Sequence, residues 1–271
     1  MMEPVLKKRI LTASILIPLA LFGLFYPPPW IFFLITTFIT FAAAWEWSGL
    51  MGLKKTASRW LYLIFFILLC SALMQVSITF ILISGFVWWW IALLLIILYP
   101  RGSGTWGQSR ICRGVMGVLT LVPCWAAMNY IRDQPAGIYA LLFLFALIWG
   151  ADSAAYFVGK KWGKTKLAPQ VSPGKSIQGV AGALVMGLLI GFIAIWLTEA
   201  PLSIWFWCLF ISLMIVVFSI VGDLLESMLK RQAGVKDSGR LLPGHGGLLD
   251  RIDSLTAAAP IYAVSMIFQG M

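Results

Sequence analysis

Charged residues are scarce in this sequence. Only 11% of its 271 residues are Asp, Glu, Lys or Arg, whereas 61% are hydrophobic. A water-soluble domain has about 25% charged residues, so this chain cannot cover its surface with polar groups. Lipid must be its main solvent. The sequence therefore predicts an integral membrane protein and excludes a soluble globular domain.

Histidine and cysteine are also scarce. The chain has one histidine, His245, and four cysteines that lie far apart: Cys70, Cys112, Cys124 and Cys208. No C-x-x-C pair occurs, so Cys and His cannot make up a zinc site. The cysteines are interpreted as small apolar packing residues.

The positive charge of the chain is not that of a nucleic-acid-binding protein. The net charge is +10, but the Lys and Arg residues stand in short clusters between apolar runs of spanning length. In a membrane protein this pattern indicates orientation and contact with anionic lipids. Nucleic acid is therefore excluded as a partner, and membrane lipid is expected as one.

The N-terminus has some features of a secretory signal peptide. Basic residues at 7–9 precede an apolar run at 11–26. A Pro27-Pro28-Pro29-Trp30 segment follows instead of a small-x-small cleavage site, and a further apolar run comes next. An uncleaved first membrane helix is the better interpretation.

Nine apolar segments predict an all-α, polytopic bundle of about nine transmembrane helices. Residues 1–135 would form helices 1–5, and residues 136–271 would form a catalytic part with helices 6–9 and cytoplasmic loops at 159–176 and 230–253. The Trp88-Trp89-Trp90 triplet is interpreted as bulk facing lipid or other helices. The nine segments are 10–26, 30–45, 60–76, 78–99, 112–131, 136–158, 177–198, 203–229 and 254–270.

The distribution of basic residues gives the orientation. With nine spans and a cytoplasmic N-terminus, nineteen of the twenty Lys and Arg residues lie on the cytoplasmic side, and only Arg132 lies outside. A wrong helix count would scatter this pattern, so the positive-inside rule supports both the count and the orientation. The absence of a clear internal repeat weighs against an inverted-repeat transporter.

Acidic residues concentrate near the last two cytoplasmic loops. Asp223, Glu226, Ser227 and Lys230 recur at three- and four-residue spacing and share a helix face. Asp250 and Asp253 stand three apart at the start of the final helix. Six of the ten acidic residues belong to these loops or their flanking helix ends: Asp152, Asp223, Glu226, Asp237, Asp250 and Asp253.

Two helices thus offer carboxylates at the same membrane depth. With Lys and Arg beside them, they suit a Mg²⁺ site that handles phosphate groups. An interfacial ring of salt bridges among Asp223, Glu226, Lys230, Asp250 and Arg251 remains open as the alternative.

A glycine-rich segment, Pro243-Gly244-His245-Gly246-Gly247, stands directly before this final helix. Its backbone N–H groups and the helix N-terminus favour an anion. A tight turn between helices is an equally good interpretation. His245 either contacts phosphate or fixes the turn.

The other long inner loop contains Pro173-Gly174-Lys175-Ser176. A P-loop is rejected because the first glycine of its motif is missing and no strand precedes it. Lys175, Ser176 and Gly179 nevertheless open a helix, where a phosphate would be held well. The alternative is a loop that binds anionic lipid.

A continuous stretch of 27 residues, 227–253, resembles the signature of phosphatidate cytidylyltransferases (CDP-diacylglycerol synthases). The matching residues are Ser227-Met228-Leu229-Lys230-Arg231, Lys236-Asp237-Ser238-Gly239 and Leu242 through Asp253. The segments 152–157, 172–176 and 222–227 are also typical of the family, with Ser153 and Ser176 as mild variants. The resemblance is close in the C-terminal half and rests mainly on hydropathy in the N-terminal half.

The resemblance implies transfer of CMP from CTP to phosphatidic acid in phospholipid biosynthesis, giving CDP-diacylglycerol and pyrophosphate. Asp223 and Asp250 would hold Mg²⁺, with a second cation as a further option, and Asp253 and Lys230 would complete the catalytic set. A bacterial-type inner membrane is expected, with the active site facing the cytoplasm; the oligomeric state is open, a homodimer being one candidate. The expected substrate-binding residues are Lys164, Ser172, Lys175, Ser176, Arg231, Lys236, Asp237, His245, Gly246, Gly247 and Arg251.

Two other function classes fit the sequence less well. A transporter of an anionic substrate would need polar residues continuing to the outer face, and helices 1–5 are expected to lack them. A non-catalytic lipid-binding scaffold would not need Asp223, Asp250 and Asp253.

Overall fold

The computed structural model describes residues 22–23, 25–101, 103–104, 106–239, 241 and 246–270. The predicted first span at 10–26 lies almost wholly outside these residues, as does His245. The elements in chain order are α2 (Pro29–Leu50), α3 (Thr56–Leu73), α4 (Ile78–Leu98), α5 (Arg110–Asp133), α6 (Gly137–Trp162), β1 (Lys166–Ala168), β2 (Ser172–Ser176), α7 (Ile177–Leu197), a 3₁₀ turn (Leu202–Ile204), α8 (Trp205–Ala233) and α9 (Leu249–Phe268).

Seven helices of the described chain, α2 to α8, are long and apolar enough to cross a membrane. They coincide with the second to eighth predicted segments, and a polytopic helical membrane protein is thereby confirmed. The helix α9 matches the ninth segment but begins at Leu249, so its first turns contain Asp250, Arg251 and Asp253. The helix α9 is not among the seven.

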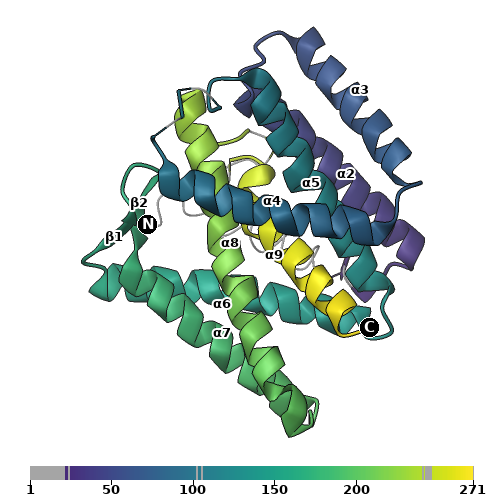
Figure 1. The fold of residues 1–271 in the computed structure, drawn as a ribbon, viewed down its shortest axis with the longest axis vertical. Helices are drawn as coiled ribbons and strands as arrows, with labels where there is room; N and C mark the ends of the chain where they lie inside the picture. The colour runs from purple at the N-terminus through teal and green to yellow at the C-terminus, as the bar shows by residue number, and fades with distance from the viewer. Residues whose placement is uncertain are drawn as a thin grey trace, which may run out of the picture.

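The helix α9 occupies the centre of the bundle. It packs against α8, α5 and α4, and Figure 1 shows it behind α4 in the middle of the molecule. Ala257, Ala258 and Ala259 are completely buried. Small side chains let neighbouring helices approach closely, which is how helices pack in lipid. By contrast, α3 lies at the edge and packs on α2.

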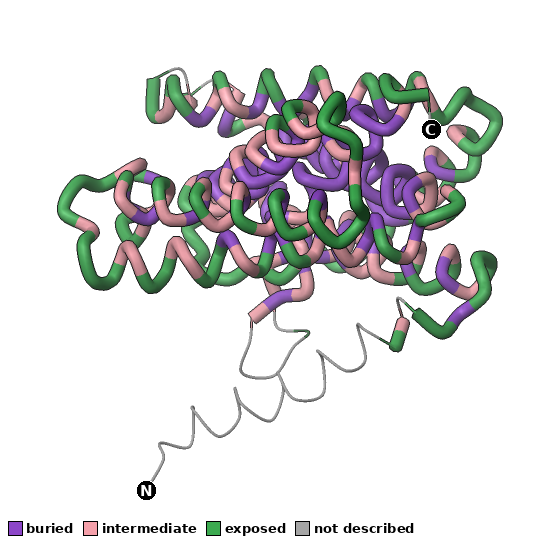
Figure 2. Tube along the Cα trace, turned by 90° about the horizontal axis from the view of Figure 1, so that it is seen from below, coloured by how far each residue is buried: buried purple, intermediate pink, exposed green. Residues whose placement is uncertain are grey.

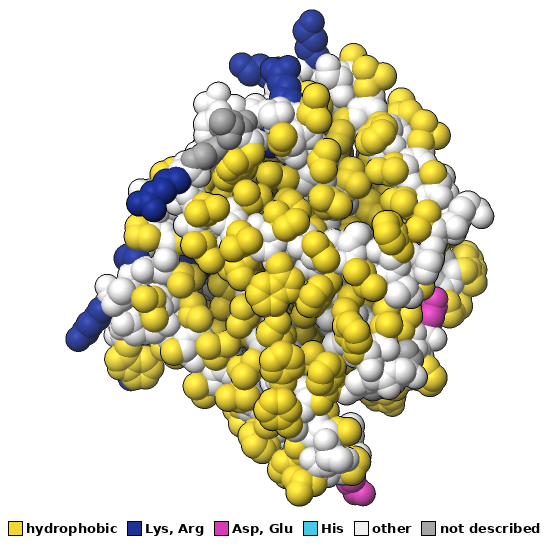
Figure 3. All heavy atoms as spheres, in the orientation of Figure 1, with side chains coloured by type: hydrophobic (Ala, Val, Ile, Leu, Met, Phe, Trp, Pro, Cys, Tyr) yellow, Lys and Arg dark blue, Asp and Glu magenta, His cyan; other side chains and the backbone are white. Residues whose placement is uncertain are grey.

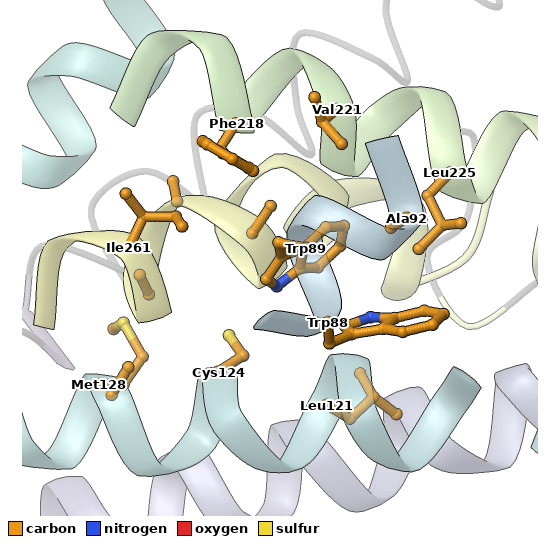
Figure 4. Close-up of a cluster of buried hydrophobic side chains, with 14 of the residues drawn as sticks. Trp88, Trp89, Ala92, Leu121, Cys124, Met128, Phe218, Val221, Leu225 and Ile261 are labelled. Atoms are coloured by element: carbon orange, nitrogen blue, oxygen red, sulfur yellow. The ribbon is translucent and has the colours of Figure 1, made fainter. Parts of the chain in front are cut away.

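The tryptophan triplet of α4 divides between core and lipid. Trp88 and Trp89 are buried in the cluster of Figure 4, where Leu121, Phe218 and Ile261 also lie. The indole of Trp88 donates a hydrogen bond to Oγ1 of Thr120 at 3.0 Å. Trp90 is 43% exposed. The triplet therefore provides bulk both to the helix core, through Trp88 and Trp89, and to the lipid-facing surface, through Trp90.

The surface has the character expected of a protein in lipid. Buried residues run through the middle of the bundle and exposed ones line its outer helices (Figure 2). The face shown in Figure 3 is largely hydrophobic, and the basic side chains visible there gather along its upper and left edge. Apolar surface of this extent is stable only against lipid.

The loop at 159–176 is more ordered than the sequence predicts. Strands β1 and β2 form an antiparallel hairpin in which Lys166 pairs with Ser176. Pro173-Gly174-Lys175-Ser176 lies within β2, which runs directly into α7. The expectation that no strand is present here is therefore wrong, although the first glycine of a P-loop is still missing.

Candidate active site

The last two helices meet at a buried ion pair. The ammonium group of Lys230 on α8 lies 2.6 Å from Oδ1 of Asp250 on α9 and 3.4 Å from Oε2 of Glu226. Glu226 and Lys230 are one helical turn apart, as their spacing predicts. The side chains of Lys230 and Asp250 are only 13% and 8% exposed.

The second oxygen of Asp250 holds the loop that precedes α9. Oδ2 accepts hydrogen bonds from the backbone N–H groups of Ser238 at 3.0 Å and Gly247 at 2.8 Å. Burial alone would raise the pKa of Asp250, but these bonds and Lys230 outweigh it and lower the pKa below its ordinary value. Asp250 is therefore ionised at neutral pH.

The β-hairpin contributes a second ion pair. The ammonium group of Lys175 lies 2.7 Å from Oδ2 of Asp223 on α8. Ser227, one turn further along, donates a hydrogen bond to Oδ1 of Asp223 at 3.2 Å. Asp152 on α6 interacts electrostatically with both Lys175 and Asp223. The hairpin and the last two helices thus form one site, as the sequence predicts, and Asp152 is a member that was not assigned to it.

Two further carboxyl groups lie between these pairs. Glu226 is 3% exposed, and neither of its oxygens has a hydrogen-bond partner in the described part of the chain. Loss of contact with water raises the pKa of Asp253, and the negative charge of Asp223 adds to the rise. The whole cluster has more carboxyl groups than ammonium groups: Asp223, Glu226, Asp250 and Asp253 against Lys175 and Lys230.

This donor set fits a hard divalent cation by its chemistry. Mg²⁺ prefers carboxylate oxygens, and the cluster has a surplus of them, including those of Glu226, which pair only with the ammonium group of Lys230 at 3.4 Å in the described part of the chain. Asp223 and Asp250 each contact a lysine. Among the described residues, no three His, Cys, Asp or Glu side chains are grouped as ligands of one ion. The assignment of Asp223 and Asp250 as metal ligands stays a prediction.

The other predicted binding residues lie at varied distances from this cluster. Ser176 is buried and caps α7, its Oγ accepting the N–H of Gly179 at 3.1 Å. Arg231 donates from Nε to the carbonyl of Val171, beside the hairpin, at 3.3 Å. Gly247 contacts Asp250 directly. Of the other predicted binding residues that the structure describes, Ser172 and Gly246 are partly buried. Lys164, Lys236, Asp237 and Arg251 are exposed.

One further buried acid, Glu46 of α2, lies beside this cluster and was not predicted from the sequence. It is 2% exposed, and its Oε2 accepts hydrogen bonds from the N–H of Leu249 at 2.8 Å and the hydroxyl of Ser238 at 3.3 Å. Glu46 lies in the second predicted span, a helix to which no site residue had been assigned. A signal was available, because a charge inside an apolar segment is costly and is kept for a reason.

Comparison with known proteins agrees with this geometry. The model of the family described as "Cytidylyltransferase family" matches residues 7–268. The chain belongs to the cytidylyltransferase family. The match spans nearly the whole chain, so it covers α2 with Glu46 as well as the C-terminal residues 227–253.

Curated members of the cytidylyltransferase family resemble the chain over nearly its full length. A protein of Pseudomonas aeruginosa named phosphatidate cytidylyltransferase is 42% identical over 260 residues, 95% of this chain and 96% of the relative. A protein of the same name from Haemophilus influenzae is 38% identical, covering 97% and 99%. One from Brucella suis is 35% identical, covering 97% and 94%.

Proposed function

We propose that this chain transfers CMP from CTP to phosphatidic acid, giving CDP-diacylglycerol and pyrophosphate. The observation that carries the proposal is the pair of lysine–carboxylate contacts, Lys175 with Asp223 and Lys230 with Asp250, joined through α8 in one cluster. The names of the relatives, which align over the whole of this cluster, support the choice of substrates.

The reaction is an in-line displacement at phosphorus. A phosphate oxygen of phosphatidic acid attacks the α-phosphorus of CTP, a new P–O–P linkage forms, and the bond to the β-phosphate breaks to release pyrophosphate. A phosphate monoester with a second pKa of about 6 is already a dianion near neutral pH, so no strong general base is required. This agrees with a site of carboxylates and ammonium groups.

The difficulty of this reaction is that both reactants are polyanions. Lys175 and Lys230 are placed to offset that charge, and each is oriented by a carboxylate at 2.7 and 2.6 Å. Fixed positive groups of this kind stabilise the charge on the transferring phosphoryl group. The exposed Arg231 beside the hairpin would contact a phosphate that extends from the cluster.

Mg²⁺ is part of the proposal, and Asp223 and Asp250 would hold it, with a second cation as an option. When bound, the ion would neutralise charge on the phosphates of CTP. Asp253 would support the site, and Gly246 and Gly247 would bring backbone N–H groups to a phosphate.

We also propose nine spans, a cytoplasmic N-terminus and an active site on the cytoplasmic side of a bacterial inner membrane. The clusters of Lys and Arg between the spans support this orientation, since such residues favour the cytoplasmic side. A site at that face would receive CTP from the cytosol while the acyl chains of phosphatidic acid stay in lipid. A homodimer stays a prediction.

Purified full-length protein in mixed micelles tests the proposed reaction. With CTP, Mg²⁺ and phosphatidic acid, CDP-lipid and pyrophosphate should form in equal amounts, and replacement of phosphatidic acid by diacylglycerol should stop the reaction because the nucleophilic phosphate is missing. Formation of CDP-lipid from diacylglycerol, or of no lipid product from phosphatidic acid, would contradict the proposal.

A further inference from the structure

The first turn of α9 is held by a carboxylate from the other half of the chain. Leu249 is the first residue of α9, and the N-cap residue Leu248 provides no side-chain hydrogen bond. Glu46 of α2 takes this role, because its Oε2 accepts the N–H of Leu249 at 2.8 Å. The first N–H groups of a helix have no partner within the helix, and a negative charge is favourable at that end.

The backbone at Gly239 and Gly247 lies close to this carboxylate. A Cβ added to Gly247 would lie 2.5 Å from Oε2 of Glu46, and one added to Gly239 would lie 2.5 Å from its Cδ. For Gly239, the three nearest atoms all belong to Glu46. These two glycines therefore give the backbone room to approach Glu46.

Glu46 and Asp250 hold the same loop residues. Ser238 donates its hydroxyl to Glu46 and its backbone N–H to Asp250. Gly247 lies against Glu46 and donates its N–H to Asp250 at 2.8 Å. Because these contacts are shared, the position of Asp250 depends on the position of Glu46.

The buried carboxylate of Glu46 is costly, which indicates a specific role. The residue is 2% exposed, and its Oε1 has no hydrogen-bond partner within the described ranges. A buried carboxylate that is incompletely hydrogen-bonded is unfavourable. An apolar residue at position 46 would be the simpler choice for stability alone.

We propose that Glu46 is a positioning residue for the transfer reaction. It fixes Ser238, Gly247 and the first turn of α9, and thereby the distance between Asp250 and Lys230. The inference rests on the proposed function, since it concerns the same site. In this role Glu46 acts through Asp250, with which it shares the loop residues Ser238 and Gly247.

Steady-state kinetics of Glu46→Ala, Glu46→Gln and the wild type test this role, in the full chain with CTP, Mg²⁺ and phosphatidic acid. Glu46→Ala should lower kcat by about 10²-fold, because a catalytic group displaced by about 1 Å costs that much. Its KM for phosphatidic acid should stay within about twofold of the wild-type value, because the substitution removes no contact that binds the substrate in its ground state. Glu46→Gln keeps an oxygen that can accept the Leu249 N–H, so this variant should retain most of the wild-type kcat.

Thr40→Val is the matched control. Thr40 is also buried on α2, and its hydroxyl donates to the carbonyl of Thr36 at 2.8 Å. It should keep wild-type kcat. Equal losses in Thr40→Val, Glu46→Gln and Glu46→Ala would overturn the inference, since general weakening of α2 would then explain them. An inactive wild type would instead refute the proposed function.

A double-mutant cycle with Gly239 gives an independent readout. Gly239→Ala should lower kcat in the wild type, because the new methyl group collides with Glu46. The φ angle of Gly239 is not in the left-handed region, so alanine causes no backbone strain there. In the Glu46→Ala background the same substitution should have almost no further effect. Additive losses in the double variant would contradict the coupling.

Discussion

The ammonium group of Lys175 lies 2.7 Å from Oδ2 of Asp223, and this contact joins the β-hairpin to the helix that carries the signature. The two side chains are 25% and 30% exposed. Solvent and substrate can therefore reach them, unlike the more deeply buried pair of Lys230 and Asp250. In the proposed function the hairpin forms one wall of the site, and the contact with Asp223 orients Lys175 before any phosphate arrives.

Replacement of Lys175 should reduce catalysis more than stability. Lys175→Ala is expected to lower kcat/KM for CTP by about 10²-fold or more, because one fixed charge on the transferring group is lost. Its thermal unfolding in detergent should change little. Lys166→Ala is the control, since Lys166 is exposed in the same hairpin. Equal kcat/KM values in the two variants would remove Lys175 from the site.

Replacement of Lys230 should reduce stability as well as catalysis. Lys230→Met leaves the buried carboxylates of Glu226 and Asp250 without their cation. Removal of one partner of a buried ion pair costs about 3–5 kcal/mol. The midpoint of thermal unfolding should fall clearly, whereas Lys236→Met, at an exposed lysine, should leave it unchanged. An unchanged midpoint for Lys230→Met would show that the pair does not stabilise the fold.

Gly246 is required by its backbone conformation. Its φ is +81°, and an added Cβ would lie 2.9 Å from Oδ2 of Asp250. Gly246→Ala should therefore lower kcat and destabilise the fold by about 1–2 kcal/mol. Gly174→Ala serves as the control, because an added Cβ at Gly174 meets nothing within 4 Å. Wild-type kcat in Gly246→Ala would show that this turn does not constrain the site.

The lowered pKa of Asp250 predicts a specific loss of stability in acid. Since the pKa is lower in the folded state, the unfolded chain takes up the proton first, and the stability contributed by Asp250 is complete above the ordinary Asp pKa of about 3.9. That contribution is lost as the pH falls through the folded pKa. Unfolding of Asp250→Asn should therefore depend less on pH below about pH 4. Parallel curves for both proteins would contradict this.

The helices and the clustering of the charged side chains on α8 could be predicted from the sequence, because lipid and helix geometry impose simple rules. A span needs about 20 apolar residues, so α2 to α8 are visible as apolar runs. The three- and four-residue spacing of Asp223, Ser227 and Lys230 fixes one helix face without knowledge of the fold. The structure confirms these proximities.

The hairpin and Glu46 could not be predicted in the same way. Strands β1 and β2 have three and five residues, too short for a periodic pattern, and their pairing depends on a loop rich in Pro and Gly. The partners of Glu46, Ser238 and Leu249, are about 200 positions away in the sequence. Only the packing of α2 near α8 and α9 brings them together.

The most direct test of the central claim is the turnover of CTP into CDP-lipid by Asp223→Asn. Asp133→Asn is the matched control, because Asp133 is an exposed aspartate at the end of α5. With phosphatidic acid and Mg²⁺, we expect Asp223→Asn to lose nearly all turnover at unchanged expression and fold, and Asp133→Asn to keep it. Near-normal turnover by Asp223→Asn would contradict the assignment of the cluster as the active site.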